Sequence, residues 1–515
     1  MSDAPSPRRR PEREPNDMPT DHRCNVLILH ADQHRWDCLG AYGNGEIRTP
    51  NIDALAADGT AYRNSFCCYP VCTPSRYSLL TGLYVHQHLG WGNHSTLPSG
   101  LPTFPRTLRS AGYRTDAVGK MHFTPTYLDV GFERMRLAEQ HGPGRWDDDY
   151  HRDLRDAGLI DRIDQMDQVQ EFRDAAPPGY WESFGAVASD LPEAHHSTTW
   201  IGDRAAEVLD QWTADRPSLL MVGFVKPHHP FDPPAAWADM YDADELTLLP
   251  GWTETILPQD GAMKRGFFRY DGLTEAGARR ALAMYYATIS QIDHQVGRLI
   301  DLLKRAGLYD DTLIVYTSDH GDYMGYHHTL LKGGYMYDPL VKVPLIVKRP
   351  GRAGGGTLSD ALVSNVDLAP TILSMAKCDV PSEMTGIDLA AHPKGRDAVF
   401  ADADRHYMVR TKDRKLLLCP DPADSLMFDL DRDPLEMDNL FRRSEHQADA
   451  DALMERLARW ALFDARTPAH LDERAGRIAA DNVPDLDDDH RHRMRQYTRG
   501  KMADAGDVLF GTGAE

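Results

Sequence analysis

The sequence predicts an α/β protein built on a mainly parallel or mixed central sheet. Four apolar runs have the length and composition of strands buried on both faces, at residues 24–30, 218–225, 312–317 and 343–348. Segments with helical spacing separate these runs. Buried strands that alternate with helices are typical of an α/β fold.

The predicted helices follow from apolar spacing and from residues that start or stop a helix. The clearest covers about 276–305, where apolar side chains step by three and four from Leu282 to Leu303 and Gly307 ends the pattern. Shorter segments add three helices and one strand. These are helices at 51–58, with Asn51 as cap and Gly59 as stop, at 103–111 and at 200–213, and a strand at 115–118.

Two irregular stretches interrupt the alternation, at 139–196 and 242–274. Long loops in a compact domain often serve as functional lids, although a surface insertion without a role is an equal alternative. After about residue 395 short strand-like pieces, at 407–410 and 415–418, indicate a small C-terminal α+β subdomain. We therefore expect a disordered tail at 1–22, a catalytic domain at 23–394, and a C-terminal subdomain and tail at 395–515.

Composition excludes several classes of protein. The 515 residues carry 57 Lys and Arg against 78 Asp and Glu, a net charge of −21 that disfavours nucleic acid and anionic membranes as partners. No apolar run approaches the ~20 residues of a membrane span. The seven cysteines form no disulfide framework, and the N-terminus lacks the apolar core of a secretory signal. A cytoplasmic location is the simplest expectation.

Polar pairs follow two of the predicted buried strands. Asp32 and Gln33 come directly after the first strand, and Asp319 and His320 directly after the strand at 312–317. Ligands gather at the carboxyl ends of strands in open α/β sheets, and oxygen donors with one imidazole suit a divalent ion. Each pair alone is weak evidence, because Asp at a strand end is commonly a cap or turn residue. Together they predict a metal site.

Lys and His side chains form a third group. Lys120 and His122 follow the strand at 115–118, and their alternation across a strand edge would point both to one side. Lys226 and His228 follow the strand at 218–225, and Lys332 lies twelve residues after His320. Each alone is most often a solvated side chain. Together they would line one pocket with positive charge that attracts an anionic substrate.

The order of motifs resembles the sulfatase family of the alkaline phosphatase superfamily. The motifs are NVLILHADQ, CTPSRYSLLTG, GYRTDAVGKMHF, KPHHPFDPP and SDHGDYMG, and the likeness extends from about residue 24 to residue 440. The resemblance implies an alkaline phosphatase-like sandwich with a central mixed, mainly parallel sheet flanked by helices. It also implies that Cys72, in the C-x-P-x-R pattern, is oxidised to formylglycine, whose hydrate attacks the ester.

The resemblance implies a role for each remaining site residue. Asp32, Gln33, Asp319 and His320, with the oxygen of residue 72, match the metal ligands. Arg76 and Lys120 match residues that stabilise the hydrated aldehyde, and His122 matches the base that releases sulfate. His228, favoured over His229, matches the residue that assists the leaving oxygen, and Lys332 matches a cation on the sulfate and the leaving group.

Two departures bear on metal and substrate. Many sulfatases carry Asp-Asp and Asp-Asn pairs, whereas the Asp-Gln and Asp-His pairs here resemble choline sulfatases and phosphonate monoester hydrolases. The family most often uses Ca²⁺, but an imidazole ligand also suits Mn²⁺ or Zn²⁺. The Lys-x-His pair in GKMHF resembles choline sulfatases and other bacterial sulfatases, which favours sulfate esters.

The expected function is hydrolysis of a sulfate monoester to an alcohol and sulfate. A phosphonate monoester or phosphodiester hydrolase on the same scaffold is the alternative. A non-catalytic binding protein is disfavoured, because the CTPSR motif and the metal set are intact. Expected partners are a small-molecule sulfate ester, a formylglycine-generating enzyme that acts transiently on Cys72, and a second copy in a homo-oligomer.

Overall fold

The computed structural model describes residues 23–140, 148–213, 215–263, 266–403, 405–466 and 488–503. Its centre is an eight-stranded sheet in the order β4-β3-β5-β1-β6-β7-β2-β8, in which only β7 runs antiparallel to its neighbours. The strands are β1 (Asn25–Ala31), β2 (Thr60–Phe66), β3 (Arg114–Gly119), β4 (Arg134–Leu137), β5 (Ser218–Gly223), β6 (Thr312–Ser318), β7 (Leu345–Lys348) and β8 (Thr357–Ser364). The predicted α/β class and mainly parallel sheet are confirmed.

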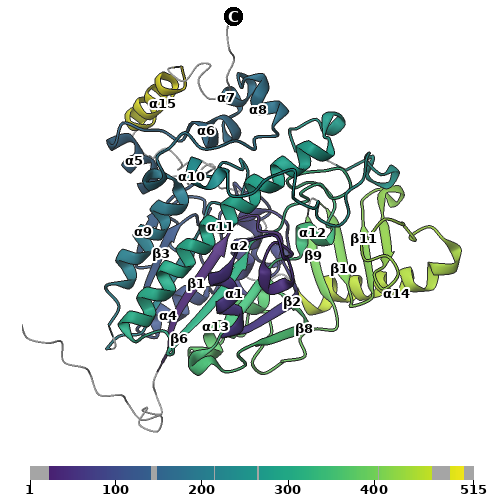
Figure 1. The fold of residues 1–515 in the computed structure, drawn as a ribbon. Helices are drawn as coiled ribbons and strands as arrows, with labels where there is room; N and C mark the ends of the chain where they lie inside the picture. The colour runs from purple at the N-terminus through teal and green to yellow at the C-terminus, as the bar shows by residue number, and fades with distance from the viewer. Residues whose placement is uncertain are drawn as a thin grey trace, which may run out of the picture.

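Helices cover both faces of the sheet, because successive side chains of a strand point to opposite sides. On β1, Val26 and Ile28 join one core cluster, and Leu27 and Leu29 join the other. The first face packs against α2 (Cys72–Thr81), α4 (Phe104–Ser110) and α13 (Leu368–Met375), and the second against α1 (Pro50–Ala57), α9 (Ser197–Leu209) and α11 (Glu275–Ala306) (Figure 1). None of the helices in the described ranges is long and apolar enough to cross a membrane.

The longest helix, α11, confirms its predicted boundaries within one residue. The Thr274 side chain accepts a hydrogen bond from the Gly277 N–H at its start, and Gly307 ends it with φ of 69°. The predicted cap of α1 is wrong: Thr49 occupies that position, and Asn51 lies in the first turn. Asn51 instead donates to Asp293 of α11, and this bond ties the two helices together.

A second, antiparallel sheet has the order β12-β11-β10-β9 and lies beside the first (Figure 1). Its strands are β9 (Val399–Ala403), β10 (His406–Arg410), β11 (Arg414–Leu418) and β12 (Leu426–Asp429), and α14 (Gln447–Arg459) packs on it. The strand-like pieces predicted at 407–410 and 415–418 are therefore present. Buried Lys415 pairs with Asp338 and Glu436, which joins this sheet to α12 (Asp338–Val341).

The stretch at 139–196 is more regular than predicted. It contains α5 (Asp149–Asp156), α6 (Arg162–Gln168), α7 (Gln170–Asp174) and α8 (Pro178–Glu182), which lie above the sheet in Figure 1. Aspartate caps begin two of these helices: Asp148 accepts from the His151 N–H, and Asp161 from the Asp164 N–H. The short helices carry little apolar periodicity, so the sequence pattern missed them.

The remaining predicted segments are only partly described. The expected tail at 1–22, residues 141–147 of the first insertion and most of the C-terminal tail lie outside the described residues. Within that tail, α15 (Asp488–Ala503) contacts the first insertion, where the Tyr497 hydroxyl donates to the Leu159 carbonyl. The remaining α-helices of the described residues are the short α3 (Val85–His88) and α10 (Ala235–Ala238).

Candidate active site

The register of the central sheet brings the two acidic pairs together. Ala31 of β1 pairs with Ser318 of β6, so Asp32 and Asp319 leave the same edge of the sheet side by side. The Gln33 N–H then donates to Asp319 Oδ1 at 3.0 Å. This is the convergence that the positions after buried strands predict.

Helix α2 delivers Cys72 to the same place. All ten residues of α2 are buried, and Cys72 is its first residue, where the helix dipole favours negative charge. The Cys72 Sγ lies 3.6 Å from Asp32 Oδ1 and 3.3 Å from His320 Nε2. Ligand atoms of Asp32, Cys72, Asp319 and His320 all lie within 4.8 Å of one another.

The donors of this cluster fit a divalent cation. Gln33 Nε2 donates to Asp322 Oδ2 at 2.6 Å, whereas Gln33 Oε1 is a buried acceptor without a hydrogen-bond partner among the described residues. His320 Nδ1 lies 2.9 Å from the Gly321 carbonyl, so Nδ1 carries the proton and Nε2 offers its lone pair to the cluster. Carboxylate and amide oxygens with one imidazole could hold Ca²⁺, Mn²⁺ or Zn²⁺.

Arg76, one turn into α2, holds the acidic residues in place. Its Nε donates to Asp319 Oδ2 and its Nη2 to Asp32 Oδ2, both at 2.9 Å, and its Nη1 donates to the Lys120 carbonyl at 2.6 Å. Burial alone would raise the pKa of Asp32, but the charges of Lys120, Arg76 and Lys332 hold it well below its usual value. Asp32 is therefore a carboxylate at neutral pH.

Lys120 lies directly after β3 rather than on a strand edge, which corrects the predicted alternation with His122. Gly119, with φ of 89°, ends the strand, and His122 adopts φ of 57°. Lys120 Nζ lies 2.9 Å from Asp32 Oδ2 and donates to Gln140 Oε1 at 3.0 Å. The backbone turn at Gly119 thus places Lys120 beside Asp32.

The backbone of His122 is fixed beside the start of α2. Its carbonyl accepts a hydrogen bond from Thr73 Oγ1 at 2.8 Å, and its N–H donates to the buried Glu139 carboxylate at 2.9 Å. The adjacent Met121 N–H donates to the same carboxylate. Two residues, Thr73 and Glu139, therefore set where His122 stands relative to Cys72.

Lys332 and His228 complete the ring around Cys72. Lys332 Nζ lies 3.1 Å from Cys72 Sγ, 3.0 Å from His228 Nε2 and 3.3 Å from His320 Nε2. His228 Nδ1 lies 2.5 Å from the His229 carbonyl, which only accepts, so Nδ1 carries a proton and Nε2 accepts from Lys332. Burial, and then the charges of Lys332 and Lys120, lower the pKa of His228 well below its usual value.

His229 faces away from this ring. Its Nε2 lies 2.6 Å from the Phe184 carbonyl and its Nδ1 2.6 Å from Asp167 Oδ1, so both ring nitrogens serve to anchor the loop. Lys226 supports the same loop from the other side, where its Nζ donates to the Pro230 carbonyl and pairs with Asp232. The structure therefore places His228, and not His229, next to Lys332, which in turn contacts Cys72.

The thiol of Cys72 is not activated as cysteine nucleophiles are. Burial and the neighbouring charge of Asp32 raise its pKa to about 11. Catalytic cysteines instead have lowered pKa values and react as thiolates. The described surroundings of Cys72 therefore favour its neutral thiol over the thiolate.

Sequence reasoning missed three residues of the site. Glu139 and Gln140 follow β4 at the same edge of the sheet, but the strand sequence RMRL exposes two arginines and gives no apolar signal. Asp322 lies three residues after Asp319 and fixes the Gln33 amide. The rule that ligands follow parallel strands would have found Glu139 and Gln140 if β4 had been recognised.

Comparison with known proteins identifies the family. Residues 24–378 match the family model described as Sulfatase. The chain belongs to the sulfatase family. Residues 326–462 of this sulfatase also match the model described as N-sulphoglucosamine sulphohydrolase, C-terminal.

Two curated relatives and one solved structure extend this result. An arylsulfatase of Clostridium perfringens is 29% identical over 470 residues, which cover 83% of this chain and 92% of the relative. A choline-sulfatase of Rhizobium meliloti is 30% identical over 472 residues, which cover 87% and 89%. The crystal structure of a phosphonate monoester hydrolase of Agrobacterium radiobacter superposes with a TM-score of 0.71 and 26% identity, over 85% of this chain and 95% of that one.

These findings confirm three predictions made from the sequence. The fold is the alkaline phosphatase-like sandwich that the motifs implied, with a small C-terminal sheet beside it. The family is the one that the motifs resembled, and the sulfatase is a sulfuric ester hydrolase.

Proposed function

We propose that this sulfatase hydrolyses a sulfate monoester with formylglycine at position 72 and one divalent ion, with Ca²⁺ favoured over Mn²⁺ and Zn²⁺. The observation that supports this most is the position of Cys72, 3.1 Å from Lys332 Nζ and within the cluster of Asp32, Asp319 and His320. When present, the ion supplies charge that stabilises the sulfate oxygens, and formylglycine supplies a hydroxyl nucleophile as its hydrate. Gln33 would be the fifth ligand through Oε1.

Charged residues around Cys72 suit an anionic ester. Three cations, Arg76, Lys120 and Lys332, gather here, and the carboxylates of Asp32 and Asp319 lie between them. Arg76, Lys120, Asp32 and Asp319 are buried and Lys332 is partly buried, so water screens their interactions with substrate only weakly. Fixed cations placed where charge develops in the transition state often supply the largest catalytic contribution.

Protons move through two histidines in this proposal. The proton for the leaving oxygen comes from Lys332 Nζ by way of His228 Nε2, which already accepts a hydrogen bond from Nζ; Lys332 is left neutral and the leaving group departs as the alcohol. His122 accepts the proton of the second hydroxyl of residue 72, which releases sulfate from the enzyme. Support for this role comes from the two bonds, from Thr73 and to Glu139, that fix its backbone beside α2.

A phosphonate monoester hydrolase is the alternative on the same scaffold. The observation that favours it is the likeness to the Agrobacterium radiobacter enzyme, with a TM-score of 0.71. Sulfate monoesters and phosphonate monoesters carry the same charge, so the cations of the site serve both. Relative rates on the two ester classes separate these functions.

Other expectations from the sequence also stay proposals. We propose that a formylglycine-generating enzyme binds the CTPSR segment transiently, before α2 closes into the core, because Cys72 is fully buried in the folded chain. The cytoplasmic location, the homo-oligomer and the domain boundaries after residues 22 and 394 are predictions from the sequence alone.

Peptide mass analysis and two variants test the proposed chemistry. The purified enzyme should contain a peptide in which residue 72 is lighter than cysteine by the change to an aldehyde. Cys72→Ala should lose turnover by several orders of magnitude and still fold, and Cys72→Ser should stop after one turnover with sulfate on the serine. Cys378→Ala, at a cysteine outside the site, is the control and should keep activity. Full activity of Cys72→Ala would exclude the covalent mechanism.

A further inference from the structure

Gln140 lies between the two halves of the site. Its Oε1 accepts a hydrogen bond from Lys120 Nζ at 3.0 Å, and its Nε2 donates to the His229 carbonyl at 3.0 Å. The side chain is buried, with 2% of its surface exposed. One amide therefore joins the cation proposed to bind sulfate to the loop that carries His228.

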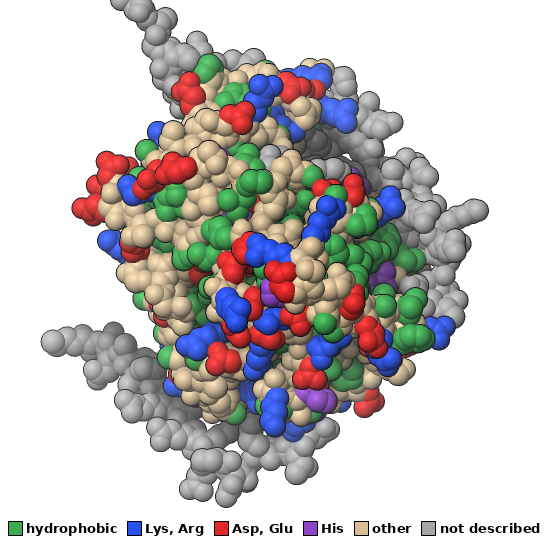
Figure 2. Space-filling view, turned by 90° about the vertical axis from the view of Figure 1, so that its right-hand side faces the viewer, with side chains coloured by type: hydrophobic (Ala, Val, Ile, Leu, Met, Phe, Trp, Pro, Cys, Tyr) green, Lys and Arg blue, Asp and Glu red, His purple; other side chains and the backbone are tan. Residues whose placement is uncertain are grey.

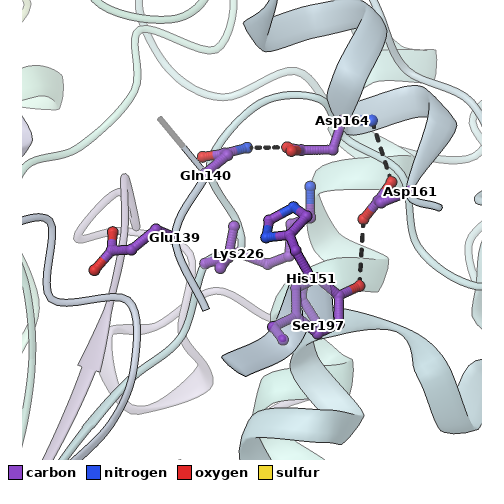
Figure 3. A pocket seen from close by; sticks show the side chains of 9 residues that line it. Glu139, Gln140, His151, Asp161, Asp164, Ser197 and Lys226 are labelled. Atoms are coloured by element: carbon purple, nitrogen blue, oxygen red, sulfur yellow. Dashed lines mark hydrogen bonds between the residues drawn. The ribbon is translucent and has the colours of Figure 1, made fainter. Parts of the chain in front are cut away.

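Asp164 fixes the orientation of this amide. Gln140 Nε2 donates to Asp164 Oδ1 at 2.6 Å, as Figure 3 shows, and its other hydrogen points to the His229 carbonyl. Both acceptors need the nitrogen on their side, so only the oxygen can face Lys120. Asp164 is held in turn by its own N–H, which donates to Asp161 Oδ1 at 3.2 Å.

The His229 carbonyl links the amide to His228. This oxygen accepts from Gln140 Nε2, from Gln168 Nε2 at 3.1 Å and from His228 Nδ1 at 2.5 Å. The bond to Nδ1 sets the tautomer of His228 and aims Nε2 at Lys332. A shift of Gln140 therefore moves the acceptor that orients His228.

The surroundings leave Gln140 little room to move. The cavity beside it has a volume of about 10 Å³, enough for about one water molecule, and Asp161, His151 and Ser197 line it (Figure 3). If the Gln140 amide moved, the buried Asp164 carboxylate would lose one of its hydrogen-bond donors. Leaving a buried acceptor without that donor costs free energy.

We propose that Gln140 is a positioning residue that couples Lys120 to His228, and that Asp164 holds it in the required orientation. The inference rests on the roles proposed above for Lys120 and His228. It also gives the first insertion a function: this stretch supports the catalytic groups from behind and is more than a surface loop. Misplacing a catalytic group by about 1 Å can cost about 100-fold in rate.

Three variants separate the two hydrogen bonds of Gln140, from Lys120 to its oxygen and from its nitrogen to the His229 carbonyl. Gln140→Leu removes both hydrogen bonds and should lower kcat by about 10- to 100-fold with a smaller change in KM. Gln140→Glu keeps an acceptor for Lys120 but loses the donor to the His229 carbonyl. Asp164→Asn weakens the hydrogen bond that fixes the Gln140 amide, so that its oxygen and nitrogen can exchange places. All three should lose more activity on an alkyl sulfate than on 4-nitrophenyl sulfate, because a poorer leaving group depends more on the proton from the Lys332–His228 pair.

A double-mutant cycle with Lys120→Met measures the coupling. The combined loss in Lys120→Met, Gln140→Leu should be at least about threefold smaller than the product of the single losses. Gln168→Leu is the matched control, because Gln168 donates to the same His229 carbonyl but is not hydrogen-bonded to Lys120 among the described residues. The fold-loss of the Gln168→Leu, Lys120→Met double variant should equal the product of the two single fold-losses, which means no coupling.

The outcomes decide the proposal whatever ester the enzyme prefers. The coupling is overturned if the loss of the Gln140→Leu, Lys120→Met double variant equals the product of the single losses. It is also overturned if every variant loses the same activity on the alkyl sulfate as on 4-nitrophenyl sulfate. Melting temperatures show whether a variant folds, and if Gln140→Leu does not, the nearly isosteric Gln140→Glu and Asp164→Asn carry the test. If wild type hydrolyses aryl phosphonates and no sulfate ester, the proposed function fails, and the same cycle is then measured on phosphonates with two leaving groups.

Discussion

Buried charges in the site depend on one another residue by residue. Arg76 donates to both Asp32 and Asp319, and Lys120 contacts Asp32 as well. Water cannot replace a missing partner in so buried a place, so the loss of one group leaves another charge uncompensated. Substitutions at single residues therefore report on the whole cluster.

Asp319→Ala should lower metal content and activity together. The substitution removes one proposed ligand and also the acceptor of Arg76 Nε, so Arg76 is left with one carboxylate fewer beside the site. Metal analysis of the purified variant and its rate on 4-nitrophenyl sulfate check this. Asp360→Ala, at an exposed carboxylate, is the control and should change neither. An Asp319→Ala protein with a full complement of metal would contradict the ligand set.

Glu139→Gln should change how stability depends on pH. Burial raises the pKa of Glu139 from 4.5 to about 7, although the His122 N–H and the charge of Lys120 oppose this. Between pH 4.5 and 7 the folded wild type therefore binds more protons at Glu139 than the unfolded chain does. Its stability contribution falls as pH rises through this window, by at most about 1.4 kcal/mol for each pH unit.

Glutamine cannot ionise, so Glu139→Gln lacks this loss. In urea unfolding at pH 5 and pH 8, the free energy of unfolding should fall more for wild type than for the variant as pH rises. Glu254→Gln, at an exposed position, should show no such movement. An unchanged difference for Glu139→Gln would mean that Glu139 is ionised throughout.

At the scale of elements, the sequence predicted the parts of the fold that are apolar and regular. β1 and β6 are buried along their whole length, and α11 has a cap, an apolar stripe and a stop. β2 was missed because its sequence TAYRNSF places an exposed Arg in the middle of the strand. β8 was missed because its first half is exposed and its partner β2 is almost 300 residues away along the chain.

The same reasoning explains which site residues were found. Asp32 and Asp319 follow strands that apolar runs define, so their convergence was predictable from local sequence. Glu139, Gln140 and Asp164 belong to a polar stretch whose contacts come from distant parts of the chain. No local pattern encodes that arrangement, because its hydrogen bonds exist only after the sheet and loops have met.

Lys415→Met should destabilise the junction between the second sheet and α12. Lys415 Nζ lies 2.9 Å from Asp338 Oδ1 and 2.7 Å from Glu436 Oε1, and both Lys415 and Glu436 are buried. Breaking a buried pair by removing one partner typically costs about 3–5 kcal/mol. Chemical denaturation measures the change. Arg63→Met, which breaks an exposed pair with Asp360, should cost less than about 1 kcal/mol, and equal costs would contradict this account.

At the scale of the whole molecule, charge is distributed differently outside and inside. The chain has a net charge of −21, yet on the face in Figure 2 Lys and Arg side chains lie among Asp and Glu side chains. The described site instead gathers Arg76, Lys120 and Lys332 around Cys72. An anionic ester is therefore attracted by the cations of the site itself rather than by the overall charge of the protein.

The geometry around Lys120 bears on the preference for sulfate or phosphonate esters. The two esters carry the same charge, but a phosphonate replaces one non-bridging oxygen by a carbon arm. Lys120 is held on two sides, by Asp32 Oδ2 at 2.9 Å and by Gln140 Oε1 at 3.0 Å, and it is fully buried. A carbon arm next to this ammonium would bury a charge against an apolar group, whereas a sulfate oxygen accepts a hydrogen bond from it.

We therefore expect a higher kcat/KM for 4-nitrophenyl sulfate than for 4-nitrophenyl phenylphosphonate, which has the same leaving group. Lys120→Ala and His122→Ala should narrow this ratio, because both open space where the carbon arm must lie, although both also slow sulfate hydrolysis. The measurement uses protein in which residue 72 is fully converted, so that both rates refer to the same concentration of active enzyme. A clear preference of wild type for the phosphonate would show that Lys120 tolerates the arm, and the enzyme would then be a phosphonate monoester hydrolase on a sulfatase scaffold.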